Sequence, residues 1–334
     1  ARWVGRWEGK SRTETGAIVR LTTTVMVLTE LLALPANYYL GFVREHRWGL
    51  SVQPLGGWIK DYLLGFVIGW ASNLFIILVV VWLIRRAARR WWLATGIALT
   101  IFGAIFTLLY PVLIDPLFVE REPMQDPQVL AMAQRLADHA GAKLDGVFLE
   151  KASLKTNRAN AMVTGLGPTK RIIIWDTLLR DYPPEEVESV VAHELGHAIY
   201  RDVFWSWVGS SLAAILGSWL VARILGTPQQ AGGLSWTRAS QPRVVVAALL
   251  LLSLISTLSA PVMNTVTRVV EARADRFALD ITANPQAFIQ SEVRLALSNP
   301  SDYDPPKLLE WFRYTHPAAM NRVRAGERWI QEHR

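Results

Sequence analysis

Long apolar stretches alternate with polar blocks along this chain, and the pattern predicts its architecture. Five stretches hold roughly the 20 residues that an α-helix needs to cross the hydrocarbon core of a bilayer. They are residues 17–34, 63–84, 92–114, 204–225 and 244–263. Stretch 63–84 contains no charged residue, whereas 17–34 is the poorest, because it carries Arg20 and Glu30 and ends at Pro35. The pattern favours membrane spans over a large soluble helical core.

Two polar blocks lie outside these stretches, residues 115–203 and residues 265–334. In the first block, residues 127–142 have helical periodicity and a glycine stop, whereas 146–149 and 171–175 are typical of short strands. The second block is charged and looks mostly helical. The predicted fold is a multi-pass α-helical membrane protein that also carries an α+β domain.

The same patterns divide the chain into four segments. We expect an N-terminal membrane region of about three spans over residues 1–114. A mixed α+β part follows at 115–203, and a transmembrane hairpin at 204–264. Residues 265–334 form a helical part that completes the site described below.

Composition narrows the class of protein further. The chain has 334 residues, 51% of them hydrophobic, and 15 tryptophans, a residue favoured at bilayer interfaces. It has no cysteine, which excludes disulfides and thiolate metal sites. The net charge of +7 fits loop arginines that face anionic lipid headgroups. Because no basic stripe marks a soluble module, we expect the lipid bilayer as a partner and no nucleic acid.

The segment that begins at Pro183 predicts a helix with one buried face. Proline suits the first turn of a helix, and the acids Glu185 and Glu186 complement the positive end of the helix dipole. The buried stripe of this helix consists of Val187, Val190, Val191 and Leu195.

This helix carries the sequence HELGH at residues 193–197. His193 and His197 are one turn apart and project from one face, so two neutral imidazoles can converge on a zinc ion at about 2.0–2.1 Å. Glu194 is rotated off that line and can act as general base toward a water molecule at the ion. The pentapeptide alone is a weak signal, because it occurs by chance in unrelated helices. The site also needs a third ligand.

Glu271, in the segment TRVVEARADRFALD, is the best candidate for the third ligand. The stretches 204–225 and 244–263 predict a helical hairpin, which returns Glu271 to the membrane face that His197 left. Asp275 lies one turn beyond Glu271 and can orient a ligand histidine through its free ring nitrogen. Without the HELGH motif, both acids would be read as charges on an interfacial helix.

Seven segments together resemble one family, the integral-membrane zinc endopeptidases of the CaaX prenyl protease type I family. The segments are LPANYYLGFVREHRWGLSVQPLGGWIKD (34–61), IDPLF (114–118), RANAMVTGL (158–166), KRIIIWDTLL (170–179), HELGH (193–197), VVEARADRFAL (269–279) and YTHPAAMNRV (314–323). They occur in the order of the family and cover most of the chain after residue 30. The resemblance implies a zincin-like α+β metalloprotease domain and one Zn²⁺ per chain. The ligands and base that it implies are His193, His197, Glu271 and Glu194.

The resemblance also indicates residues that spacing alone would not select. It implies a substrate-binding role for Asn160, and a catalytic role for His316 and Arg322, with Arg322 also holding substrate. Donors aimed at developing negative charge make a large contribution to catalysis. Without the resemblance these residues read as a turn asparagine, a helix-start histidine and a surface arginine. A substrate peptide can add as a strand beside the zinc helix, although the sequence does not identify the edge strand.

The sequence departs from the family pattern in two respects. Asp202 stands where many members of the family have another histidine. That histidine is not a required metal ligand, so the zinc interpretation is unaffected. Five spans are found where the resemblance implies seven, so we expect that N-terminal spans are missing from this chain.

The two indications of membrane orientation conflict. The basic cluster at residues 85–90 places the block 115–203 outside the cytoplasm by the positive-inside rule. The opposing loop carries Arg44, Arg47 and Lys60, and the resemblance implies a cytoplasmic active site. We favour a bacterial plasma-membrane protein with a cytoplasmic active site.

The sequence as a whole predicts a membrane zinc metalloendopeptidase, in which a zinc-activated water attacks a peptide bond with Glu194 as general base. The expected partner is a peptide or protein substrate, and a prenylated C-terminus is one alternative. A quality-control protease of unrelated specificity is a second. A catalytically inactive zinc-binding scaffold is a third, but the intact Glu194 argues against it.

Overall fold

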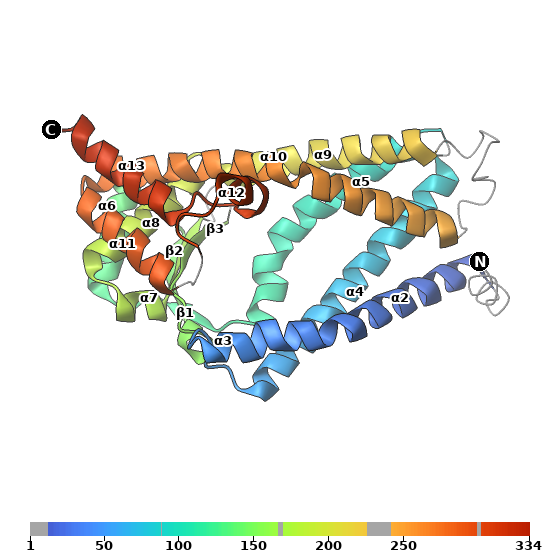
Figure 1. The fold of residues 1–334 in the computed structure, drawn as a ribbon, viewed down its shortest axis with the longest axis horizontal. Coiled ribbons are helices and arrows are strands. Elements are labelled where there is room, and N and C mark those ends of the chain that lie inside the picture. The colour runs from blue at the N-terminus through green and yellow to red at the C-terminus, as the bar shows by residue number, and fades with distance from the viewer. Residues whose placement is uncertain (1–12, 88, 166–169, 226–241, 299–301) are drawn as a thin grey trace. The chain divides into compact units, whose positions relative to one another are not determined.

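The computed structural model describes residues 13–87, 89–165, 170–225, 242–298 and 302–334, and Figure 1 labels its elements. The chain forms two compact units. The first contains Ala1–Arg44, Leu55–Thr107 and Ser206–Leu258. The second contains Glu45–Pro54, Leu108–Trp205 and Ser259–Arg334, so both polar blocks of the sequence contribute to it.

Among the described residues, five helices are long and apolar enough to cross a membrane. They are Thr15–Arg47, Leu55–Arg86, Trp91–Leu117, Asp202–Ile224 and Leu250–Thr282. Bulky apolar side chains on them face outward, with Leu32 83% and Leu258 69% exposed, as expected of surfaces that contact lipid. The predicted multi-pass helical membrane protein is confirmed.

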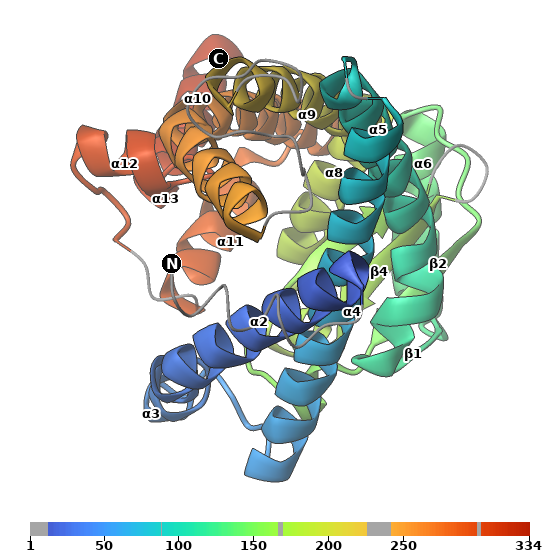
Figure 2. The same cartoon turned by 90° about the vertical axis from the view of Figure 1, so that its right-hand side faces the viewer.

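The first unit is built from long helices. They are α2 (Glu14–Tyr38), α4 (Leu55–Arg86), α5 (Trp91–Leu109), most of α9 (Asp202–Leu225) and the first part of α10 (Pro242–Thr282). α2 packs against α4, as Figure 2 shows, and the indole Nε1 of Trp70 donates to Thr23 Oγ1 at 3.0 Å between them.

The first membrane helix does not end at Pro35, and in this respect the sequence prediction is wrong. Pro35 lies inside α2, and the helix continues as a π-helical segment, Tyr39–Val43, and then as α3 (Arg44–Arg47). The N–H of Tyr39 bonds to the carbonyl oxygens of both Ala36 and Pro35. Such local adjustments keep backbone groups bonded near a proline, which is why membrane helices tolerate it.

The second unit contains a four-stranded sheet in the order β1-β2-β4-β3. The strands are β1 (Arg121–Pro123), β2 (Gly146–Glu150), β3 (Ala161–Thr164) and β4 (Arg171–Trp175). β2 and β4 are parallel, with Phe148 opposite Ile173, and the other two pairs are antiparallel. The strands predicted at 146–149 and 171–175 are confirmed. β1 and β3 are the edge strands of this described sheet.

The second unit also contains helices. They are α6 (Pro127–His139), α7 (Asp176–Asp181), α8 (Pro184–Ile199), α11 (Pro285–Ser298), α12 (Lys307–Arg313) and α13 (Ala319–Glu332). Of these, α7 packs on β4. Single helical turns occupy Tyr110–Ile114, Asp115–Leu117 and Ala152–Leu154. α8 packs on β3 and on α11, and α11 packs on α13 (Figure 1). The buried core between them includes Ile172, Ile174, Val191, Leu195 and Phe288.

α10 (Pro242–Thr282) carries the third candidate ligand. The helix continues through Pro261 without interruption, from the apolar stretch that was predicted as a span to the charged segment that contains Glu271. Glu271 is therefore held on a long rigid helix rather than on a loop.

Candidate metal centre

The local sequence of α8 explains why it presents two histidines side by side. Pro184 occupies the first turn, where a missing N–H has no cost, and Glu185 lies beside it at the positive end of the helix. Val187, Val191 and Leu195 are at most 2% exposed and anchor one face of the helix in the core. This face fixes the rotation of α8 about its axis, and the histidines are placed by that rotation.

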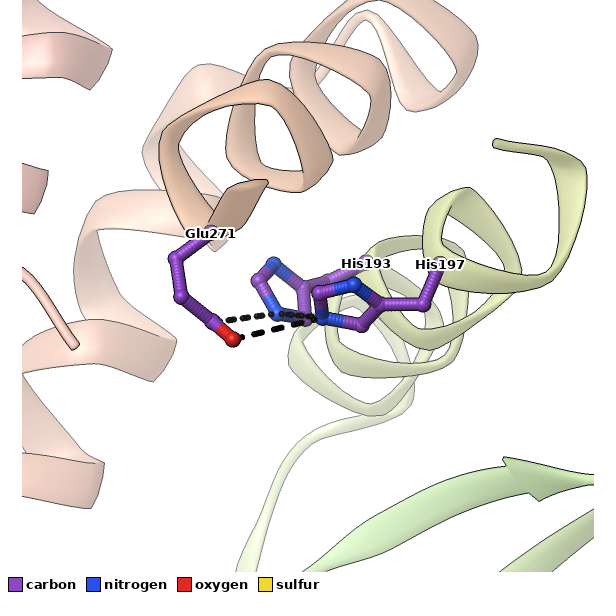
Figure 3. Close-up of side chains that lie close together, drawn as sticks. All are labelled: His193, His197 and Glu271. Carbon is purple, nitrogen blue, oxygen red and sulfur yellow. Dashed lines mark hydrogen bonds and ion pairs between the residues drawn. The ribbon is translucent and has the colours of Figure 1, made fainter. Parts of the chain in front are cut away.

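His193 and His197 of α8 and Glu271 of α10 point toward one another (Figure 3). One ligand atom from each lies within 4.8 Å of the other two. The Nε2 atoms of the histidines are 3.2 Å apart, and Glu271 oxygens lie 3.3 Å from His193 Nε2 and 3.7 Å from His197 Nε2. The structure thus brings together the three residues that the sequence selected as ligands.

A carboxylate contacts the second ring nitrogen of each histidine. Asp275 Oδ1 lies 2.8 Å from His193 Nδ1, and Asp202 Oδ2 lies 2.9 Å from His197 Nδ1. Because a carboxylate only accepts hydrogen bonds, each Nδ1 donates to its carboxylate, and each Nε2 faces the other two ligand residues. Asp275 was expected to orient a histidine, and its place beside His193 agrees with that expectation.

The sequence interpretation assigned no role to Asp202. It lies five residues after His197, where Arg201 takes a left-handed conformation with φ 57° and turns the chain back toward the site. The signal that the sequence offered for such a role was a carboxylate only five residues after the second ligand histidine. Arg273 pairs with the other oxygen of Asp202 and fixes it in turn.

The residues present fit a divalent metal ion. The carboxylate of Glu271 faces the Nε2 atoms of both histidines, and positive charge between these three groups stabilises the arrangement. Glu271 Oε2 is buried and forms no hydrogen bond within the part of the chain that the structure describes. Burial by itself lowers the pKa of His193, but the carboxylates of Asp275 and Glu271 outweigh burial and raise it to about 10. The site therefore favours positive charge at this position, and a His₂Glu donor set suits zinc.

A cavity of about 520 Å³ opens beside these residues and is lined by both His193 and Glu194. Glu194 is partly buried, and burial raises its pKa, although both neighbouring histidines act in the opposite direction. A carboxylate with a raised pKa holds a proton more firmly, which is the property of a general base.

The three residues indicated by the resemblance also line this cavity. They are Asn160, His316 and Arg322. The Nε2 of His316 lies 3.5 Å from Glu271 Oε2. Asn160 directly precedes β3, and its carbonyl oxygen accepts from the N–H of Trp175 at 3.1 Å. Their proposed roles in catalysis and substrate binding stay predictions.

Arg322 lies deeper than a surface arginine, with a side chain 13% exposed. Its Nε donates to Asp275 Oδ2 at 2.9 Å, and its NH1 pairs with Glu292 Oε2 at 2.6 Å. Both carboxylates raise the pKa of Arg322 above its ordinary value, against the effect of burial, so the guanidinium stays charged. Glu292 was not selected from the sequence, because a lone glutamate on a predicted helix carries no signal of its own.

The comparisons with known proteins agree with this geometry. Residues 123–330 match peptidase family M48, and residues 1–120 match the family described as CAAX prenyl protease N-terminal, five membrane helices. The uncharacterized metalloprotease YhfN of Bacillus subtilis is 30% identical over 304 residues, which cover 90% of this chain and 71% of that protein. A CAAX prenyl protease 1 homolog of Arabidopsis thaliana is 26% identical over 307 residues, with coverages of 90% and 71%.

One solved structure shares the fold over nearly the whole chain. The crystal structure of S. mikatae Ste24p matches with a TM-score of 0.84 at 23% sequence identity, and the match covers 95% of this chain and 77% of that one. The zincin-like α+β domain and the membrane helices predicted from the sequence are both confirmed by this likeness.

Proposed function

We propose that this chain, which belongs to peptidase family M48, acts as a membrane-embedded, zinc-dependent endopeptidase. One observation carries the proposal: His193, His197 and Glu271 converge on one point, and the carboxylate of Glu194 lines the same cavity. A site for a metal ion and a general base thus share one space that is large enough for part of a peptide.

A zinc ion held there supplies Lewis acidity, which polarises a carbonyl group and lowers the pKa of water toward about 7. Glu194 accepts the proton of the attacking water at its carboxylate and then gives it to the amine that leaves. Arg322 lines the cavity, and its Nη1, which pairs with Glu292, has a second N–H that could donate to an oxyanion developing there. His316 and Asn160 complete the polar lining around substrate.

The edge strand β3 offers a place for the peptide backbone. Asn160, which leads into β3, lines the cavity, and β3 pairs with β4 on one side only. A substrate that adds as a strand along β3 would reach the cavity with its backbone already held by main-chain hydrogen bonds.

Two substrate classes remain for this peptidase. Relatives named CAAX prenyl proteases favour a prenylated C-terminal peptide, because the match to them extends over both the membrane and the metal-binding parts. The similar Bacillus subtilis protein is named only as an uncharacterized metalloprotease, so a membrane-protein quality-control role is the second class. We propose the CaaX-type reaction first and test it against the second class.

The active site is proposed to face the cytoplasm of a bacterial cell. The chain contains no cysteine, so a single introduced cysteine can be labelled without background. Gln128→Cys, on an exposed position of α6, should resist a membrane-impermeant maleimide in intact cells, whereas Arg90→Cys should react. The opposite pattern would place the active site outside the cytoplasm.

The test of function compares wild type with Glu194→Gln in detergent, on one peptide made with and without a prenyl group. Cleavage by wild type alone supports the assignment of Glu194. A preference for the prenylated peptide supports the CaaX-type reaction, and equal cleavage supports the quality-control role. If wild type binds zinc and cleaves neither these nor unfolded membrane-protein substrates, the inactive scaffold replaces the peptidase.

A further inference from the structure

One wall of the cavity belongs to α11, which carries none of the metal ligands. Phe288, Ser291, Glu292 and Leu295 of this helix line the cavity. They lie three or four residues apart and so form one helical face. Glu292 is only 5% exposed, and neither metal binding nor the proposed chemistry uses it. A buried carboxylate in a substrate cavity needs its own explanation.

Glu292 shares its cationic partner with another carboxylate. Its Oε2 pairs with Arg322 NH1 at 2.6 Å, but the same guanidinium is also held by Asp275, through Nε at 2.9 Å. Asp275 also contacts His193 Nδ1 at 2.8 Å, whereas Glu292 has Arg322 as its one cationic partner among the described residues, and it is only 5% exposed. Burial raises the pKa of Glu292 to about 7, which Asp275 reinforces and Arg322 opposes. A second cation near Glu292 would give this carboxylate a partner that it does not share.

Ser189 provides a separate indication of a missing polar partner. It lies one turn before His193 on α8, lines the cavity and is 1% exposed. Its Oγ is buried and has no hydrogen-bond partner among the described residues. Ser291 also lines the cavity. Its Oγ donates a hydrogen bond to the carbonyl oxygen of Phe288 at 2.8 Å, and the lone pairs of this Oγ can still accept one. A ligand with several N–H donors would satisfy these atoms.

The rest of this wall is apolar. Val190, Phe288, Leu295 and Ala296 line the cavity beside the polar atoms. Lysine and arginine combine a methylene stem with a charged, donor-rich end, and they bury the stem along apolar surface. A cavity with apolar sides and a carboxylate in its wall is complementary to that shape.

We propose that Glu292, together with Ser189 and Ser291, forms a specificity pocket that takes a basic side chain of the peptide substrate. This inference rests on the proposed peptidase function. Glu292 is then a specificity-determining residue: it selects the substrate by charge and takes no part in proton transfer.

The test uses a cleaved peptide in which each position flanking the scissile bond is, in turn, lysine or norleucine. Norleucine keeps the stem and lacks the charge. At one position we expect wild type to prefer lysine by at least about tenfold in kcat/KM, as close charge pairs can supply. Glu292→Gln should bring that ratio down to about 2 or less and leave the other positions unchanged. Ser189→Ala should lower the same ratio about threefold.

Gln290→Glu is the matched control, because it adds a carboxylate to an exposed position of the same helix outside the cavity. It should leave the ratio unchanged. The inference is overturned if wild type cleaves peptides without a lysine preference at any position. It is also overturned if Glu292→Gln slows all peptides equally, because Glu292 then only positions Arg322. In both cases the peptidase function stands, whereas a wild type that cleaves no peptide removes both proposals together.

Discussion

Replacing Asp275 by asparagine should weaken metal binding, and its effect on the stability of the fold can be measured independently. The carboxylate is 2% exposed and lies 2.8 Å from His193 Nδ1. Asparagine keeps an acceptor oxygen but loses the charge that holds the Nδ1 proton. Removal of such a partner of a ligand histidine lowers metal affinity about 10- to 100-fold, which is about 1.4–2.8 kcal/mol.

The effect on unfolding should stay below the cost of a broken buried ion pair. Breaking a buried ion pair costs about 3–5 kcal/mol when it leaves a charge without a partner. Here Arg322 keeps Glu292 as a partner at 2.6 Å, and the substitution even balances their charges. The remaining cost is the loss of hydrogen bonds to a charged group, which we place at about 1–3 kcal/mol.

The zinc affinity is measured by competition with a chromophoric chelator, and stability by thermal unfolding in excess chelator. The matched variant is Asp202→Asn, because Asp202 contacts the other ligand histidine. The partner of Asp202, Arg273, has a side chain 42% exposed, so solvent can replace part of its contribution and we expect tenfold or less. An Asp275→Asn protein with wild-type zinc affinity would refute the orienting role.

Three further predictions concern packing, pH and metal removal. A methyl group at Gly196 would lie 3.1 Å from Phe277 and 3.3 Å from Ala274 Cα of α10. Gly196→Ala should therefore lower the free energy of unfolding by about 1–3 kcal/mol and weaken zinc binding. Chemical denaturation measures the first effect, and chelator titration measures the second. The raised pKa of Glu292 means that the folded state binds its proton more tightly than the unfolded state, so its contribution to stability is present below about pH 4.5 and is lost as the pH rises through about 7. Unfolding midpoints of wild type should therefore fall from pH 5 to pH 8 by more than those of Glu292→Gln, and an equal fall in both would contradict this. Excess chelator should lower the unfolding midpoint of wild type and leave that of Glu271→Ala unchanged, and an equal shift in both would assign the metal to other residues.

The parts of the fold that follow from local pattern were predictable. The five apolar stretches, the two strands with Ile172–Ile174 and Val147–Leu149, and the start of α8 at its prolines depend on composition within one segment. The path of the chain at Pro35 was not, because the helix continues through this proline to Arg47, and the hydrophobic pattern does not show whether a proline ends a membrane helix.

The metal ligands were predictable because chemistry restricts them. Two histidines one turn apart need a third ligand, and the hairpin topology left Glu271 as the best candidate. The residues beyond the ligands depend on tertiary contacts. Asp202 reaches His197 through a left-handed turn at Arg201, and Glu292 meets Arg322 from a separate helix. Neither contact has a sequence spacing that a single chain reveals.

We propose that His193, His197 and Glu271 hold one zinc ion and that Glu194 acts beside it as the general base. The most direct test is the metal content of wild type, Glu194→Ala and Glu271→Ala after identical purification, with peptide cleavage measured on the same samples. We expect about one zinc per chain in wild type and Glu194→Ala, little zinc in Glu271→Ala, and cleavage by wild type alone. Zinc-free wild type, or cleavage by the Glu194→Ala protein, would contradict it.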